Sequence, residues 1–353
     1  MKTLRCSVTR LSYLALGALV GSLLPAGCGN GDDAPPNNPG QDGGVDAGTI
    51  DDASPTPDTQ NPPNDAAGSK SARGRIAAGR EFSCALDETG AIVCWGPMGS
   101  VNRPPAGTGH TWIAAGGIEA CAIKSDGEIV CWDMARAAEG AVVRNVPAGP
   151  FVEVAIGARP SGEYACGQRA SGELACWRSA NLMQRPELTM PASNPPFGRF
   201  DLGANAACGV RLDGTLSCWG TSSTPVTMNV PSGQFVDVVA NEFHGCAVDT
   251  NGRPKCWGPN SYFAENFPQG ARAVQLEGSS YADITCALLA SGSVYCSRQS
   301  DTYPAPSNNV GITEISVAED HYCFVMSDRS VGCRTDGTST SHAPPATLRV
   351  PAK

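Results

Sequence analysis

Cysteine is the residue type in this 353-residue chain that is most able to do chemistry. Fourteen of the 16 cysteines fall into seven pairs, and the two members of each pair are ten residues apart. The pairs are Cys84 and Cys94, Cys121 and Cys131, Cys166 and Cys176, Cys208 and Cys218, Cys246 and Cys256, Cys286 and Cys296, and Cys323 and Cys333. Zinc ligands usually lie two to four residues apart, with a second pair or histidines nearby. The wider spacing favours disulfides over a metal site.

The segment inside each pair is typical of a β-hairpin. Six pairs carry glycine six residues after the first cysteine, as at Gly90. A three-residue loop 88–90 with glycine at its third position places Cys84 opposite Cys94. The two cysteines then form a non-hydrogen-bonded pair with a Cα separation of roughly 4.5 Å, which a disulfide can bridge. We therefore expect one local disulfide within each hairpin.

The first cysteines of successive pairs lie 37, 45, 42, 38, 40 and 37 residues apart, which indicates seven repeats. A short run of small apolar residues precedes each hairpin, and a Pro-x-Gly turn follows a further run such as 225–230. This pattern predicts four short strands in each repeat. The expected fold is all-β: a seven-bladed β-propeller with four antiparallel strands and one hairpin disulfide per blade.

The two ends of the repeat array are complementary. The first repeat begins at residue 75 without the strand that precedes a Pro-x-Gly turn, and residues 346–351 resemble that missing strand. We expect the C-terminal strand to complete blade one, which would remove an open sheet edge. The alternative is that this strand belongs to blade seven.

The repeat unit resembles the regulator of chromosome condensation repeat. In this chain it consists of 77–79 (Ala-Ala-Gly), 84–86 (Cys-Ala-Leu), Gly90 and 93–96 (Val-Cys-Trp-Gly). The resemblance covers roughly residues 74–353 and implies a seven-bladed propeller. It implies no single activity, because members of this family include an exchange factor, chromatin binders and an enzyme inhibitor. Two cysteines in every repeat depart from the eukaryotic pattern and suit an oxidising compartment.

The first 73 residues differ in composition from the repeats. Residues 1–28 are typical of a bacterial lipoprotein signal peptide, with a basic start, an apolar stretch and Cys28 as the lipidation site. Residues 29–73 form a linker rich in Gly, Pro, Asp and Asn that we expect to be disordered. Residues 74–353 form the propeller. We expect a lipid-anchored protein of the cell envelope, at the outer membrane and either periplasmic or surface-exposed.

The remaining composition gives little sign of catalysis or of a cofactor. The formal net charge of −9 is unfavourable for nucleic-acid binding. The sequence contains no G-x-S-x-G, P-loop or H-E-x-x-H motif, so we predict neither a cofactor nor a metal. The four histidines, His110, His244, His321 and His342, are expected to be structural. Tryptophan follows the second cysteine in five pairs, which favours packing between blades over a sugar-binding platform.

Loops that differ between repeats are the predicted interaction sites. Insertions in repeats three and six contain Arg159, Tyr164 and Tyr281, and an inter-blade loop presents Tyr262, Phe263 and Phe267. We predict a monomeric binding scaffold whose partner is an unidentified envelope or extracellular protein, and which meets the membrane through its lipid alone. The alternatives are a carbohydrate-binding module and a lyase or hydrolase that acts at the channel mouth.

Overall fold

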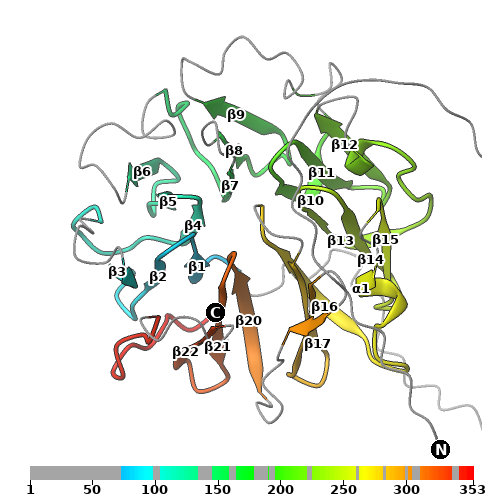
Figure 1. Ribbon diagram of the computed structural model, residues 1–353. Coiled ribbons are helices and arrows are strands. Elements are labelled where there is room, and N and C mark those ends of the chain that lie inside the picture. Colours follow the sequence, from blue (N-terminus) through cyan, green and yellow to red (C-terminus); the bar gives the residue numbers. More distant parts are fainter. Residues whose placement is uncertain are drawn as a thin grey trace, which may run out of the picture. The chain divides into compact units, whose positions relative to one another are not determined.

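The computed structural model describes residues 73–97, 104–133, 145–158, 164–178, 190, 195–220, 225–259, 262–280, 284–298, 301–303, 311–335 and 342–353. These residues form seven antiparallel sheets, one for each pair of cysteines. Figure 1 shows the sheets arranged around a common centre as the blades of a propeller, with the first strand of each blade innermost. The predicted all-β, seven-bladed propeller is confirmed. None of the described helices is long and apolar enough to span a membrane.

Three strands recur in every blade. The innermost strands are β1 (Ile76–Ala78), β4 (Trp112–Gly116), β7 (Glu153–Gly157), β10 (Phe197–Leu202), β13 (Phe235–Ala240), β16 (Ala273–Gly278) and β20 (Ile312–Val317). The middle strands are β2 (Ser83–Leu86), β5 (Glu119–Ile123), β8 (Tyr164–Gln168), β11 (Ala206–Arg211), β14 (Gly245–Asp249), β17 (Ile284–Leu289) and β21 (His321–Met326). The third strands are β3 (Ile92–Trp95), β6 (Ile129–Asp133), β9 (Leu174–Arg178), β12 (Leu216–Gly220), β15 (Pro254–Trp257), β18 (Val294–Arg298) and β22 (Val331–Thr335). Blades one to seven are numbered in this order.

The predicted fourth strand is found, within the described residues, in blade six alone, where β19 (Asp301–Tyr303) pairs with β18. The expectation of four strands per blade is therefore corrected to three for the other six blades as described. Residues 225–230 begin instead with the 3-10 helix η4 (Pro225–Thr227). Proline lacks the amide hydrogen that a strand needs, and Asn229 has a positive φ of 56°, which strands do not tolerate. Both features explain why this run does not pair.

The hairpins match the predicted register. In blade one Cys84 faces Cys94, and Gly90 closes the loop with a φ of 75°. All seven cysteine pairs form disulfides, each with its two Cα atoms 4.0–4.1 Å apart. The seventh hairpin has Arg329 at the glycine position, and it adopts the same left-handed conformation with a φ of 68°. These turns lie at the end of the propeller where the inner strands begin, and we call this end the hairpin face.

The hydrophobic core lies between blades. Each of the seven buried clusters joins side chains of consecutive blades, or of blades seven and one. The tryptophans that follow the second cysteines are all buried: Trp95, Trp132, Trp177, Trp219 and Trp257. Their predicted packing role is confirmed, because a buried indole is no platform for a sugar.

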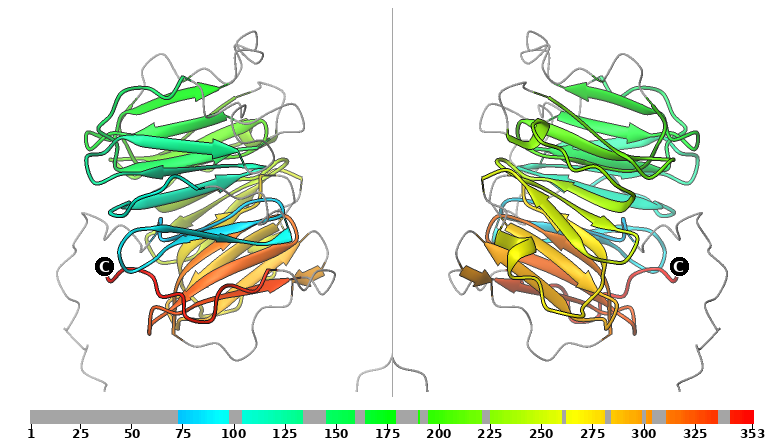
Figure 2. Two further views of the ribbon diagram at one scale, coloured as in Figure 1. Left: turned by 90° about the vertical axis from the view of Figure 1, so that its left-hand side faces the viewer. Right: turned by 90° about the vertical axis from the view of Figure 1, so that its right-hand side faces the viewer.

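The C-terminal segment, residues 342–353, lies where blade seven meets blade one. Arg349 forms an isolated antiparallel β-bridge with Ser330, and the amide of Val350 donates to the carbonyl of Arg329 at 3.0 Å. Ser330 and Arg329 belong to blade seven. The side chains of Leu348 and Val350 pack against β1–β3 of blade one. The segment therefore closes the ring by contacting both blades, whereas the predicted strand pairing with blade one is absent from the described sheets. Figure 2 shows the segment, in red, beside the strands of blade seven.

Candidate functional site

A ring of polar side chains surrounds the centre of the propeller at the hairpin face. On each innermost strand, one residue faces the first cysteine of the blade's hairpin. The residue two positions before it is polar or charged in six blades: Arg75, Glu153, Arg199, Asp237, Gln275 and Glu314. Trp112 takes this position in blade two. An innermost strand leaves one edge of its backbone without a strand partner, and such an edge needs other hydrogen-bond partners.

These side chains supply hydrogen bonds to the inner strand of the next blade. Glu314 accepts from the amide of Arg75 at 2.8 Å, and Asp237 accepts from the amide of Leu276 at 2.7 Å. Gln275 donates to the carbonyl of Ile315 at 2.9 Å. The polar ring is therefore first a device that satisfies the backbone at the channel and orders the blades around it.

The charges of the ring are paired. Arg75 Nε lies 2.7 Å from Glu314 Oε2, and Arg199 lies 3.3 Å from Glu153 and 3.5 Å from Asp237. Arg73 also contacts Asp237 and lies 3.2 Å from Glu277. Buried charges of this kind are costly unless they are paired, so the pattern explains why arginines and acids alternate around the centre.

Two acids of the channel titrate close to neutrality. Burial raises the pKa of Asp201 to about 6 and the pKa of Glu277 to about 7, although Arg73 opposes both shifts. Perturbed acids in a concave site are typical of functional centres. The channel cavity, however, measures about 120 Å³, well below the roughly 300 Å³ of the smallest ordinary ligand pockets. The channel therefore has the charge of a functional site but a smaller volume than an ordinary ligand pocket.

A second cluster lies at the opposite end of blade seven and resembles a hydrolytic triad in its connections. Ser83 Oγ is 2.7 Å from His321 Nε2, and His321 Nδ1 is 2.7 Å from Asp320 Oδ1. A nucleophile needs access to its substrate, but Ser83 is fully buried. The same histidine–hydroxyl pair also recurs between blades five and six, where His244 Nε2 is 2.8 Å from Thr285 Oγ1. The pair is therefore a hydrogen bond between neighbouring blades.

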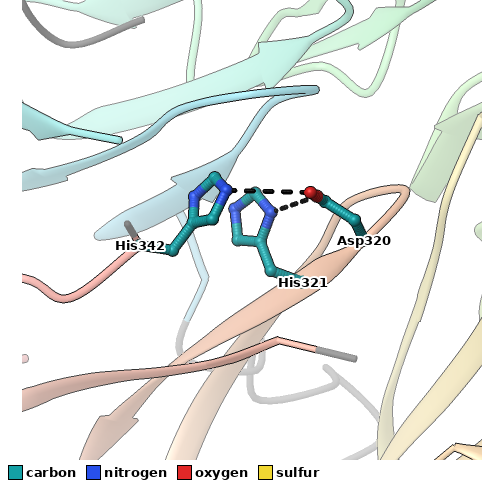
Figure 3. Close-up of side chains that lie close together, drawn as sticks. All are labelled: Asp320, His321 and His342. Atoms are coloured by element: carbon teal, nitrogen blue, oxygen red, sulfur yellow. Dashed lines mark hydrogen bonds and ion pairs between the residues drawn. The ribbon is translucent and has the colours of Figure 1, made fainter. Parts of the chain in front are cut away.

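His342 adds a fourth member to this second cluster. Its ring stacks on that of His321 with centroids 3.8 Å apart, and its Nε2 lies 3.8 Å from Asp320 Oδ2. Figure 3 shows a nitrogen of each ring directed toward the Asp320 carboxylate. Burial and the neighbouring His321 lower the pKa of His342, whereas the hydrogen bond from His321 lowers the pKa of Asp320. Two imidazoles and a carboxylate form a donor set that could hold a metal ion.

Those predicted interaction residues whose side chains the structure describes are buried. Phe263 lies on α1 (Tyr262–Glu265), and both Phe263 and Phe267 are buried against the ring of Tyr295. The prediction that they are exposed is wrong, because three aromatic rings at 5.3–5.8 Å gain more from packing together than from contact with water.

The other predicted residues divide into buried and undescribed positions. Tyr164 is buried, and its hydroxyl donates to the carbonyl of Gly203 at 2.7 Å, so it is also corrected to a structural residue. Arg159 and Tyr281 lie outside the described residues, as does the side chain of Tyr262. Cys28 and residues 29–72 of the linker also lie outside them, whereas Arg73, its predicted last residue, is buried in the propeller.

Four of the six exposed large hydrophobic side chains among the described residues lie on the hairpin face of blades three to six; the other two are Met228 and Phe243. Val236 and Val274 are the extra residues of β-bulges at the starts of β13 and β16, and Val152 directly precedes β7. In blade four the bulge residue is Gly198, and Leu212 from the adjacent turn lies over it. We call Val152, Leu212, Val236 and Val274 the apolar arc; they are 38, 67, 50 and 47% exposed.

The structural sites could have been found in part by aligning the repeats. The polar ring occupies one repeat position, and its members precede the small-residue run by two, as Glu153 precedes Ala155. Three members of the apolar arc, Val152, Val236 and Val274, occupy the preceding position, and Leu212 comes from the hairpin turn of blade four. The Asp320–His321–His342 cluster carries no such signal, because His342 lies outside the repeat pattern and reaches His321 only through ring closure.

Comparison with known proteins supports the repeat assignment. The model of the regulator of chromosome condensation (RCC1) repeat matches residues 75–98, which span the first hairpin. The predicted resemblance to this repeat is thus confirmed. None of the curated protein sequences compared with the chain matches it.

Solved structures share the fold at low sequence identity. The entire ectodomain of the receptor kinase CR4 from Physcomitrella patens is 20% identical, with a TM-score of 0.59, over 76% of this chain and 74% of that chain. The CRINKLY WD40 ectodomain of the receptor kinase ACR4 from Arabidopsis thaliana is 19% identical, with a TM-score of 0.59, over 77% and 98%. Human WBSCR16 is 11% identical, with a TM-score of 0.51, over 71% and 86%. At these identities the likeness concerns the fold.

Proposed function

We propose that this RCC1-repeat propeller is an extracytoplasmic scaffold that binds a partner protein through the apolar arc on its hairpin face. The observation that carries the proposal is the exposure of Val152, Val236 and Val274 at one repeat position, with Leu212 covering that position in the intervening blade four. Isolated exposed apolar residues are common, but a row of them on one face is typical of a recognition surface.

The cellular setting follows from the cysteines. Seven disulfides are typical of proteins that fold in an oxidising compartment. We further propose that Cys28 carries the lipid anchor and that residues 29–72 act as a flexible tether up to Arg73, which is buried in the propeller. The number of cysteines supports the lipid anchor, because Cys6 would be removed with the signal peptide and every remaining cysteine except Cys28 is paired. Anchoring to the outer membrane is part of the same proposal.

The experiment is affinity capture of the tagged full-length protein from cross-linked envelopes of its native cells. The test variant is Val236→Asp with Val274→Asp. The control is Thr111→Asp, which places one such charge at the corresponding, exposed position of blade two. Thermal unfolding of each variant confirms that the propeller is intact.

The proposal requires a protein that is captured by the wild type and by Thr111→Asp but lost from the arc variant. Equal capture by both variants would exclude the apolar arc as the binding surface. If no protein is captured above a linker-only control, or only polysaccharide is recovered, the protein-binding function itself is wrong. Labelling with radioactive palmitate, compared with Cys28→Ser, tests the anchor separately.

A further inference from the structure

The structure assigns a binding site for a divalent transition-metal ion of the zinc type to Asp320, His321 and His342, at the joint between blade seven and the C-terminal segment. One candidate ligand atom from each residue lies within 4.8 Å of the others. Imidazole nitrogens with one carboxylate are a donor set that zinc and its neighbours prefer over calcium or magnesium. The site is independent of the apolar arc, which lies on the other face.

The hydrogen bonds of His321 leave the correct nitrogen available. Ser83 Oγ lies 3.3 Å from Sγ of Cys323, which accepts but cannot donate because it belongs to a disulfide. When the hydroxyl donates to that sulfur, it accepts from His321 Nε2 at 2.7 Å. A metal ion would replace the proton through which His321 Nδ1 donates to Asp320 Oδ1 at 2.7 Å. Metal-bound histidines commonly donate through their second nitrogen, here Nε2 to Ser83.

His342 supplies the independent observation. It is 2% exposed, yet neither of its ring nitrogens has a hydrogen-bond partner among the described residues. A buried polar group without a partner is costly, and native proteins rarely leave one. Its Nε2 is directed toward Asp320 (Figure 3). A metal ion between His342, His321 and Asp320 provides the missing partner.

The geometry requires the two stacked rings, whose centroids are 3.8 Å apart, to tilt so that both nitrogens point at one ion. Zinc–ligand bonds of about 2.0–2.2 Å in a tetrahedron hold neighbouring ligand atoms roughly 3.3 Å apart. The two contacts of Asp320 measure 2.7 Å to His321 and 3.8 Å to His342, so they lie on either side of that value. The carboxylate is 30% exposed, which gives the ion a route from solvent. Three protein ligands leave a fourth position for water.

The location gives the metal a role. His342 begins the described part of the C-terminal segment, and its carbonyl accepts a hydrogen bond from Trp95 Nε1 in blade one at 3.1 Å. A metal held by His342 and by blade seven would therefore fasten the segment that closes the ring. Because an ion that binds only the folded state stabilises it, ring closure would depend on metal.

The test uses the full-length protein without an affinity tag. Titration with Zn²⁺ is followed by calorimetry and by the visible spectrum of Co²⁺ as a substitute, which reports tetrahedral nitrogen and oxygen ligation. We expect one ion per chain, and a rise in melting temperature of roughly 5 °C at a hundredfold excess over the Kd.

Three variants decide the outcome. Asp320→Asn and His342→Ala should each weaken Zn²⁺ binding at least about tenfold and abolish the Co²⁺ spectrum. His244→Ala is the matched control, because it removes the equivalent inter-blade histidine without touching the site, and it should bind the ion as the wild type does. Asp320 is partly exposed, so Asp320→Asn keeps the test valid even if His342→Ala does not fold. Failure of the wild type to bind, or equal binding by Asp320→Asn and the wild type, would overturn the site.

Discussion

The junction between blades five and six and the junction between blades seven and one share a hydrogen-bonding scheme but differ in covalent connection. His244 with Thr285, and His321 with Ser83, join the middle strands at 2.8 and 2.7 Å. At the first junction the chain continues from one blade into the next. At the second no peptide bond crosses, and the structure adds Arg75–Glu314, Arg329–Glu88 and the C-terminal segment. The difference indicates that noncovalent contacts replace the missing connection.

The largest effect should come from the C-terminal segment. Replacing both Leu348 and Val350 with Ala removes buried side chains that cover blade one, and should lower the free energy of unfolding by about 4 kcal/mol. Leu212→Ala is the control, because the same truncation at an exposed position should cost less than about 0.5 kcal/mol. Urea denaturation measures both. Similar losses in the two variants would mean that the segment does not close the ring.

The buried ion pair of the closing junction should come next. Glu314→Gln leaves Arg75 buried without its carboxylate, and should cost about 3 kcal/mol. Adding Arg75→Met removes the unpaired charge and should restore part of that loss. A double-mutant cycle from urea denaturation gives the coupling energy. Strictly additive losses would show that the pair contributes nothing specific to closure.

The pH dependence of stability should reflect the acids on the channel side of blades four to six. Burial raises the pKa of Glu277 from 4.5 to about 7, so the folded state binds this proton more tightly than the unfolded state does. The charged form then costs stability above pH 7, and the penalty is released as the pH falls toward 4.5. Between pH 8 and pH 5.5 the unfolding free energy should rise, and Glu277→Gln should remove up to about 2 kcal/mol of that rise. An unchanged pH profile in the variant would contradict the assignment.

The histidine–hydroxyl hydrogen bonds allow the two junctions to be compared directly. Ser83→Ala and Thr285→Val each remove one hydroxyl at corresponding positions, and each should cost about 1 kcal/mol. Equal changes in melting temperature would show that the bond stabilises an open and a covalent junction alike. A loss at Ser83 several times larger would show that closure depends on it.

The smallest expected effect concerns the seventh hairpin. Arg329 has a φ of 68°, and its guanidinium lies 2.8 Å from the exposed Glu88 across the closing junction. Arg329→Gly relieves about 1 kcal/mol of backbone strain and loses a surface ion pair of at most about 0.5 kcal/mol. The variant should therefore melt slightly higher than the wild type, whereas Arg329→Ala should melt lower. A lower melting temperature for Arg329→Gly than for the wild type would show that the ion pair contributes more than the backbone strain costs.

The sequence predicts the local parts of this structure well because its signals are local. The ten-residue spacing and Gly90 define the hairpin register, and that register places Cys84 against Cys94. The candidate sites depend on contacts between residues far apart in the chain. His342 contacts His321 only because the ring closes. Phe263 and Phe267 are buried because the ring of Tyr295, on β18, covers them. The sequence indicates that Phe263 and Phe267 follow a strand in a loop, but it does not indicate that Tyr295 packs over them.

The disulfides have a mechanical consequence, because each joins residues of one hairpin and none crosses between blades. Tension applied through the chain before Arg73 would load β1 and the contacts around Lys353, whose ammonium donates to the Arg73 carbonyl. The ring would part at its noncovalent joint and then release blades one after another. Each disulfide shortens the stretched chain by ten residues less its own span, so the fully stretched chain would remain about 210 Å shorter than its reduced form. A pulling experiment would therefore yield short, regular length increments that grow when a reductant is added.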